Sequence, residues 1–240
     1  MQANNIDKAG LSSFFASMMN DDTKNRSSED FSKELEKLGS NISVSSGTDG
    51  ITFQVSSLKK NLDATLVLLE DRMLNPKFTE DAFSRIKRQS LESFKQTKSQ
   101  PAAIASSVFD KLNYGKDNIL GISQRGTEET VKTFTLQDVE NYYANNISSQ
   151  GTNVVVVGDL TEGEIVPKLS FLNKLPNKKV EIPAVKATSN VEKTKIYFVD
   201  VKGAAQTEFR VGDITNLKYD ATGEYFKAFL TNYPLGGAFN

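Results

Sequence analysis

The sequence predicts an α+β fold, and three patterns support that prediction. Apolar residues recur at helical spacing in several segments, beginning with residues 10–23. Two short runs of alternating polarity, residues 42–44 and 51–55, flank a Ser-Gly-Thr-Asp-Gly turn, which predicts an antiparallel hairpin with one buried face. Four consecutive valines, residues 154–157, predict a buried central strand.

The first predicted helix, over residues 10–23, is amphipathic, and we expect the rest of the chain to pack around it. Its apolar face is formed at i, i+3, i+4, i+7 and i+8 spacing by Leu11, Phe14, Phe15, Met18 and Met19. The polar stripe beside that face carries Ser12, Ser13, Ala16 and Ser17.

Further helices are predicted from caps, breakers and apolar spacing. A serine cap at Ser27 or Ser28 and a terminal Gly39 bound the second helix. After the hairpin, the same reasoning predicts helices over residues 62–73 (stopped by Asn75-Pro76), 79–98, 101–112 (opened by Pro101), 135–143 and 161–172 (irregular near Pro167).

The last part of the chain restarts the pattern after a break. Residues 176–193 contain two prolines and several lysines without a regular period, which predicts a linker. Two strands are predicted at residues 196–201 and 207–211, joined by a Lys-Gly-Ala-Ala turn, and a helix over residues 220–232 follows.

Composition narrows the class of protein. Of the 240 residues, 38% are apolar and 25% are charged, as in an ordinary globular protein. The net charge of −1 argues against a nucleic-acid or anionic-membrane partner, because there is no basic excess to neutralise phosphates. No apolar run approaches the ~18 residues that would span a bilayer, so we expect no membrane insertion.

Two missing residue types are more informative. The chain has no cysteine, which excludes disulfides, a thiol nucleophile and cysteine-based zinc sites. It has no histidine, the commonest zinc ligand and the side chain most used as a general base near neutral pH. A carboxylate-only site for magnesium or calcium stays open, although no D-x-D-x-D-G loop is present.

The first helix resembles that of the pitrilysin/insulinase-type zinc metallopeptidases, the group that includes mitochondrial processing peptidase. Their pattern is G-L-A-H-F-L-E-H-M-L-x-x-G-T, which contains the inverted zinc motif H-x-x-E-H. Laid over this chain, the two histidines fall on Ser13 and Ser17, and the catalytic glutamate falls on Ala16. The scaffold of the motif is present and its chemistry is absent.

Three later segments extend the resemblance over nearly the whole chain. Residues 124–143 followed by 154–159 are similar to the family's G-T-x-E…D-L-x-x-F-Y…V-V-G-D block. Residues 202–206 resemble its P-G-A-x-Q turn, with lysine in place of proline, and residues 235–240 resemble its L-G-G-G-F-x loop.

The resemblance implies a fold and a domain plan. Family members are built from repeated α+β domains, each an antiparallel sheet with helices packed on one face, and two such domains form a half. We therefore expect residues 1–175 to be a first domain without its N-terminal strands, 176–193 a linker, and 194–240 the start of a second domain, the whole truncated at both ends.

The resemblance also implies a site that holds no metal. The third zinc ligand of active members is a glutamate on a later helix, and here that position falls on Ser93, with Glu92 one residue away. One carboxylate without histidines cannot hold zinc at useful affinity. We predict no metal ligands and no catalytic residues in this chain, and expect zinc only in an active partner or half.

In this family two halves enclose a chamber that admits peptides. We expect a non-catalytic half or subunit whose partners are an active zinc-bearing peptidase half and a peptide substrate, which it grips by pairing along a sheet edge. Two alternatives stay open: a degenerate stand-alone scaffold that binds peptides or proteins, and a fragment of an active metalloendopeptidase whose H-x-x-E-H lies elsewhere. Bacterial relatives suggest the periplasm or cell envelope.

One structural hypothesis follows from the expected loss of the first strands. The first sheet would have a vacant edge, and an unpaired apolar edge is a liability. We expect the strands within residues 195–213 to fill it, either within the chain or from a neighbouring molecule in a strand-swapped homodimer.

Overall fold

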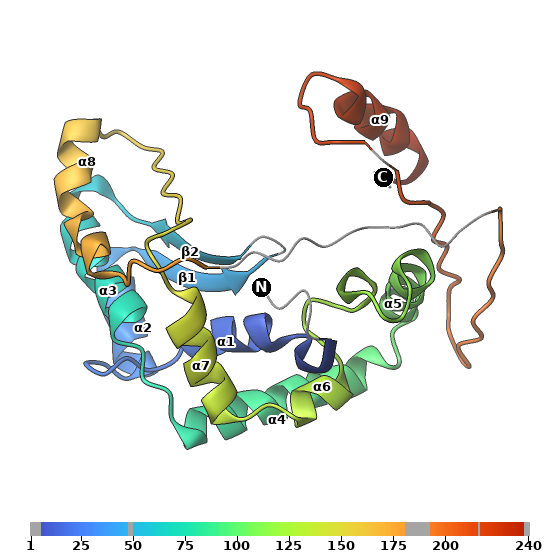
Figure 1. Cartoon of the computed structure of the whole chain (residues 1–240), viewed down its shortest axis with the longest axis horizontal. Coiled ribbons are helices and arrows are strands. Elements are labelled where there is room, and N and C mark those ends of the chain that lie inside the picture. The colour runs from blue at the N-terminus through green and yellow to red at the C-terminus, as the bar shows by residue number, and fades with distance from the viewer. Residues whose placement is uncertain (1–5, 48–49, 181–192, 216, 238–240) are drawn as a thin grey trace.

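The computed structural model describes residues 6–47, 50–180, 193–215 and 217–237 (Figure 1). The described residues form helices around one small sheet. The α-helices are α1 (Leu11–Met19), α2 (Ser28–Leu38), α3 (Leu62–Leu74), α4 (Glu80–Thr97), α5 (Pro101–Tyr114), α6 (Glu128–Lys132), α7 (Leu136–Asn146), α8 (Glu162–Lys168) and α9 (Glu224–Asn232). Short 3-10 turns cover Ile6–Lys8, Lys59–Asn61, Ile119–Gly121 and Ser170–Lys174, and a π-helical turn covers Tyr233–Gly237.

The predicted hairpin is confirmed. Strands β1 (Asn41–Ser46) and β2 (Ile51–Ser56) pair antiparallel, with Val44 opposite Phe53. Ile42 and Val44 are buried in the core, while their neighbours along β1 are more exposed. This alternation is what a strand with one covered face produces.

Helix α1 lies at the centre of the core, as predicted. It packs between the hairpin and the helices α4 and α7 (Figure 1). The ring of Phe14 meets Phe83 of α4 edge-on at a centroid distance of 5.2 Å, and the ring of Phe15 lies 4.7 Å from that of Tyr142 in α7. Both phenylalanines are buried, so the apolar face seen in the sequence contacts three elements at once.

Several helix ends confirm the local signals. The hydroxyl of Ser27 accepts from the backbone N–H of Asp30 at the start of α2, and Gly39 ends that helix in the left-handed conformation with φ 58°. Thr79 caps α4 in the same manner as Ser27, and Pro101 opens α5. Near Pro167 the helix α8 ends and continues as a 3-10 turn, which matches the predicted irregularity.

The first helix is shorter than predicted, because its last turn is redirected by Asn20. The side-chain amide of Asn20 donates to the carbonyls of Ala16 (2.9 Å) and Val44 (2.7 Å). Its oxygen accepts from the N–H of Val44 (2.9 Å) and from Nη1 of Arg72 (3.0 Å). All the hydrogen-bonding capacity of the amide is used. The predicted end at residue 23 is wrong because the chain turns at Asn20 to meet β1.

The strand predicted at residues 154–157 is wrong. The segment belongs to no regular element, no backbone group of the described residues is hydrogen-bonded to it, and the side chain of Val155 is 85% exposed. A strand forms only where a neighbour completes its ladder, and a run of valines supplies the propensity without supplying that neighbour. The sheet of the described residues therefore has two strands.

The strands predicted at residues 196–201 and 207–211 are also wrong as paired strands. Both segments are irregular and unpaired within the described chain, and Ile196 is 95% exposed. They do not fill the edge of the first sheet, so the version of our hypothesis that placed them there within one chain is contradicted. Most of the predicted linker, 181–192, and the last motif residues, 238–240, lie outside the described residues.

Candidate functional site

Three of the positions predicted to correspond to the zinc motif, Ser13, Ala16 and Ser17, lie on α1. Ser13 and Ser17 are four residues apart and therefore share one face of the helix. The hydroxyl of Ser13 donates to the carbonyl oxygen of Gln124 (2.8 Å), and that of Ser17 donates to the carbonyl of Ser13 (3.1 Å). Ala16 does not belong to the polar stripe as predicted, because it is 4% exposed and packs in the core.

The fourth motif position, Ser93, lies on α4 and is joined to α1 through a loop. Nη2 of Arg125 donates to the hydroxyl of Ser93 (2.6 Å), and the guanidinium lies 5.8 Å from the ring centre of Phe94. Because Gln124 contacts Ser13 and Arg125 contacts Ser93, consecutive loop residues bring the two helices' motif positions together. The guanidinium of Arg125 occupies the hydroxyl of Ser93, and the backbone of Gln124 occupies the hydroxyl of Ser13.

Two glycines allow that loop to cross the start of α1. Gly10 has φ 94° and Gly126 has φ 76°, values in the left-handed region that favours glycine. A Cβ on Gly126 would lie 2.2 Å from the carbonyl oxygen of Ala9, and one on Gly10 would lie 2.5 Å from that of Arg125. The loop and the helix are in direct backbone contact, which fixes where Arg125 stands.

Replacing Gly126 with alanine is expected to lower the free energy of unfolding by at least about 2 kcal/mol, from backbone strain and a backbone clash together. Gly151 is a matched control, because it also has φ 76° but has no heavy atom within 4 Å of its would-be Cβ. Gly151→Ala should cost only the strain, roughly 1 kcal/mol. Urea unfolding of both variants measures the difference, and equal losses would contradict the contact.

The described residues contain no metal-ligand set. No three aspartate or glutamate side chains gather within reach of one ion in the described ranges. Glu92, the carboxylate nearest the predicted ligand position, is exposed and pairs with Lys95 (2.8 Å). Ser13, Ala16, Ser17 and Ser93 offer three hydroxyls and a methyl group, and hydroxyls that already donate to carbonyls are poor zinc ligands. The arrangement can bind polar groups but has no general base.

An open polar cleft of about 740 Å³ lies between α1 and α4 beside these positions. Its walls include Ser17, Ser90, Gln89 and Arg125 near the motif. Asp21 lies at its other end, where its carboxylate forms an ion pair with Arg85. The cleft therefore extends from the predicted motif positions to the Asp21–Arg85 ion pair, just beyond the C-terminal end of α1.

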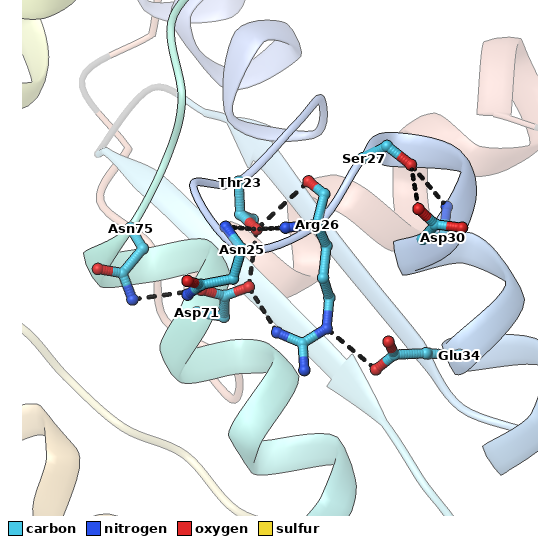
Figure 2. A network of polar contacts seen from close by, with 8 residues as sticks. All are labelled: Thr23, Asn25, Arg26, Ser27, Asp30, Glu34, Asp71 and Asn75. Atoms are coloured by element: carbon cyan, nitrogen blue, oxygen red, sulfur yellow. Dashed lines mark hydrogen bonds and ion pairs between the residues drawn. The ribbon is translucent and has the colours of Figure 1, made fainter.

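A network around the buried carboxylate of Asp71 holds the chain that follows α1 (Figure 2). Asp71, on α3, is 4% exposed. It accepts hydrogen bonds from the hydroxyl of Thr23 (2.7 Å), Nη1 of Arg26 (2.8 Å), and the side-chain amides of Asn25 and Asn75. Arg26 also pairs with Glu34 of α2 (3.0 Å), so the network links α2, α3 and the loop between α1 and α2.

The electrostatics of this region follow from burial and pairing. Burial acts to raise the pKa of Asp71, but hydrogen bonds from Thr23, Asn25, Arg26 and Asn75 outweigh it, so that pKa lies below its usual value. Burial lowers the pKa of Arg72 to about 10, although Asp21 and Asp71 oppose that change. The guanidinium of Arg72 stacks 3.9 Å over the ring of Phe31 and remains charged at neutral pH.

Comparison of the sequence with models of protein families identifies the family of this chain. The profile of "Insulinase (Peptidase family M16)" matches residues 2–118, and that of "Peptidase M16 inactive domain" matches residues 133–239. The chain belongs to peptidase family M16. The resemblance read from the first helix and the three later motifs is therefore confirmed, over nearly the whole chain.

The curated relatives include a protein named as a non-peptidase homolog and others named as peptidase subunits. The chain is 26% identical over 231 residues to the "Non-peptidase homolog YmxG" of Helicobacter pylori, which covers 96% of this chain and 52% of that protein. It is 22% identical over 165 residues to a probable mitochondrial-processing peptidase subunit beta of Arabidopsis thaliana, covering 68% of this chain and 30% of that protein. The chain thus spans about half, or less, of the length of these relatives.

Solved structures confirm the M16 fold. A peptidase M16 inactive domain from Pseudomonas fluorescens matches with a TM-score of 0.69 at 19% identity, over 77% of this chain and 46% of that one. A protease from Helicobacter pylori matches with a TM-score of 0.64 at 20% identity, over 76% and 45%. The predicted α+β fold of helices packed on an antiparallel sheet is confirmed, with a sheet of two strands among the described residues.

Two features of this M16 site were not found from the sequence. Arg125 lies within a matched motif, but no local pattern shows that it reaches Ser93. For Asn20, the apolar spacing predicts only an ordinary position within the helix. The Asp-Asp-Thr-Lys-Asn-Arg run that follows it, dense in hydrogen-bonding side chains after an apolar helix, was the available signal for the Asp71 network.

Proposed function

We propose that this chain is a non-catalytic half or subunit of an insulinase-like zinc peptidase, which helps to enclose peptide substrates and bind them. The observation that supports it most is the state of the motif positions. Ser13 and Ser17 donate to backbone carbonyls, Ala16 is buried, and Ser93 accepts from Arg125. Ala16 lies in the core, Ser13 and Ser93 are half-buried and bonded to the loop at residues 124–125, and the exposed Ser17 bonds within its own helix, so none of the four side chains is arranged to hold a metal.

The proposed contacts with peptide lie at two places. The outer edge of β1 offers backbone groups to an added strand, although the Val44 pair is already taken by Asn20. The polar cleft between α1 and α4 is lined in part by Asn20, which binds Val44 of β1, and the cleft can accept side chains. The proposed partners are a zinc-bearing peptidase half, in the same polypeptide or in another, and an unfolded peptide.

The test is reconstitution with an M16 chain that carries H-x-x-E-H. Cleavage of an unstructured fluorogenic peptide is measured for this chain alone, for the partner alone and for the mixture. We expect no zinc and no cleavage for this chain alone, and at least a tenfold higher rate for the mixture than for the partner alone. Cleavage by this chain alone that chelators abolish would refute the proposal.

The second candidate function is a stand-alone role in binding peptides or proteins. It is supported by the similarity to a Helicobacter pylori protein that is named a non-peptidase homolog. It predicts micromolar peptide binding by this chain together with no effect on any zinc-bearing M16 partner. Fluorescence anisotropy with the same peptide separates the two, because the first proposal requires the increase in rate.

A further inference from the structure

A groove of about 860 Å³ lies between α5, the end of α4 and the start of α1. It is separate from the polar cleft between α1 and α4, although Arg125 lines both. Helix α5 packs mainly against the short turn Ile119–Gly121, so part of its surface stays free to line the groove. A volume of ~300–1,000 Å³ is typical of ligand sites. The apolar walls are formed by half-buried side chains from α4, α5 and the segment after α5: Phe94, Ile104, Val108, Leu120 and Ile122.

The groove contains a cation that has no counter-charge among the described residues. Arg125 is exposed, and its guanidinium is held in place by the hydroxyl of Ser93 and the ring of Phe94. No carboxylate of the described ranges forms an ion pair with it. A guanidinium has several N–H donors in a planar fork, so Arg125 can still bind both oxygens of a carboxylate while it donates to Ser93.

The start of α1 adds to the positive potential of the groove. Gly10, Leu11 and Ser12 belong to its lining. The helix has no side-chain cap and no acidic residue in its first turn, so its first N–H groups and its dipole favour an anion there. The close backbone contact between Gly10 and Arg125 places the arginine beside this helix start. Two independent features therefore favour a negatively charged group in the same part of the groove.

The other charged side chains of the groove do not cancel this potential. Lys8 forms an ion pair at 2.7 Å and Glu128 forms two, at 2.5 and 2.7 Å, so both are already compensated. Lys111 and Glu129 are exposed and of opposite charge. Asp110, on α5, is half-buried and forms no ion pair among the described residues, and burial raises its pKa. Asp110 would favour a cationic ligand, against the two features that favour an anion.

We propose that this groove binds the C-terminus of a peptide, with the terminal carboxylate on Arg125 and an apolar terminal side chain between Phe94 and α5. The ligand combines an apolar group with a carboxylate, as the walls and the unpaired guanidinium together require. The arginine fixes the orientation of the peptide, and the apolar walls select its last side chain.

A peptide fits this part of the molecule better than a fatty acid does. Arg125 also lines the polar cleft, where Ser17, Ser90 and Gln89 can form hydrogen bonds with the backbone of the preceding residues. A fatty acid offers a carboxylate and an apolar chain but has no polar backbone for the cleft. The site rests on the proposed function, which supplies the peptide, and it specifies which end of that peptide the chain holds.

The test compares two forms of one peptide, whose binding to this chain is measured by fluorescence anisotropy at low salt. An unstructured peptide, labelled at its N-terminus and ending in phenylalanine, is made as the free acid and as the C-terminal amide. We expect the free acid to bind at least about tenfold more tightly, because charge-assisted hydrogen bonds to a guanidinium are stronger than neutral ones. A terminal glycine in place of the phenylalanine should weaken binding by at least about tenfold, because no apolar side chain is then buried.

Variants of the chain locate the carboxylate. Arg125→Gln should remove the preference for the free acid. Arg88→Gln is the matched control, because Arg88 is also an exposed arginine, lies on α4 and lines neither cavity. Asp110→Asn should bind the free acid at least as tightly as the unmodified chain, since it removes a like charge from the groove.

Equal binding of the acid and the amide would overturn the proposal, as would a preference for the acid that Arg125→Gln retains. Loss of binding in Asp110→Asn would show that the groove holds a cation, and bound dodecanoate that the peptide does not displace would show that it holds a fatty acid. Each of these results leaves the proposed function standing if the mixture with a zinc-bearing partner still cleaves faster. A preference for the acid without that increase in rate would refute the peptidase half and keep the binding site.

Discussion

Replacing Asp71 with alanine is expected to lower the free energy of unfolding by about 3–5 kcal/mol, the largest loss of stability that we predict for a single side chain. The carboxylate is buried and accepts hydrogen bonds from Thr23, Asn25, Arg26 and Asn75. Its removal leaves a guanidinium and several donors in the protein without their acceptor. Removing one partner from a buried charge pair typically costs this much.

Asp63 on the same helix provides the control. It forms an ion pair with Lys168, but its side chain is 75% exposed, and exposed pairs contribute little. We expect Asp63→Ala to change the unfolding free energy by less than about 1 kcal/mol. Urea denaturation at neutral pH compares the two, and similar losses would show that the network around Asp71 does not stabilise the fold.

The contribution of Asp71 to the free energy of unfolding should depend on pH, and the direction of that dependence follows from its lowered pKa. The folded protein holds the pKa of Asp71 below its usual value, whereas in the unfolded chain that pKa is near 3.9. The native state therefore binds the proton less readily than the unfolded one, and the stabilisation is present above about pH 4 and is lost as the pH falls through the folded value. Asp71→Asn should reduce this acid-dependent loss, measured from pH 6 to pH 2.

The elements that the sequence predicted correctly are those whose signals are local. Ser27 and Gly39 bound α2 because a hydroxyl can cap a helix and a glycine can adopt positive φ without help from distant residues. The hairpin at residues 41–56 needs only alternating polarity and a short turn. Ser13 and Ser17 share one helix face, as their four-residue spacing predicts.

The features that the sequence did not predict depend on distant partners. The valines at 154–157 have strand propensity, but a ladder needs a neighbour, and none lies beside them in the described structure. Asn20 ends α1 because Val44 and Arg72 offer matching groups from two other elements. Arg125 reaches Ser93 across 32 positions, a contact that no local pattern encodes.

Restoring ligands to the degenerate motif is expected to create a zinc site in a chain that we predict to bind none. The variant Ser13→His/Ser17→His/Ser93→Glu/Arg125→Ala places two imidazoles one turn apart on α1 and a carboxylate on α4, which packs against α1, and removes the cation that binds the side chain at position 93. Three protein ligands and a water suit zinc. We expect a dissociation constant at or below about 1 µM, roughly −8 kcal/mol.

A control moves one ligand by a single residue. Ser12→His in place of Ser13→His keeps the composition but turns the first imidazole toward β1, since the hydroxyl of Ser12 accepts from that of Ser46 (2.9 Å). That variant should bind zinc at least a hundredfold more weakly in competition with a chromophoric chelator. Equal binding by the two variants would show that α1 and α4 do not hold the motif geometry. Tight binding by the first alone would show that this site lacks only its ligands.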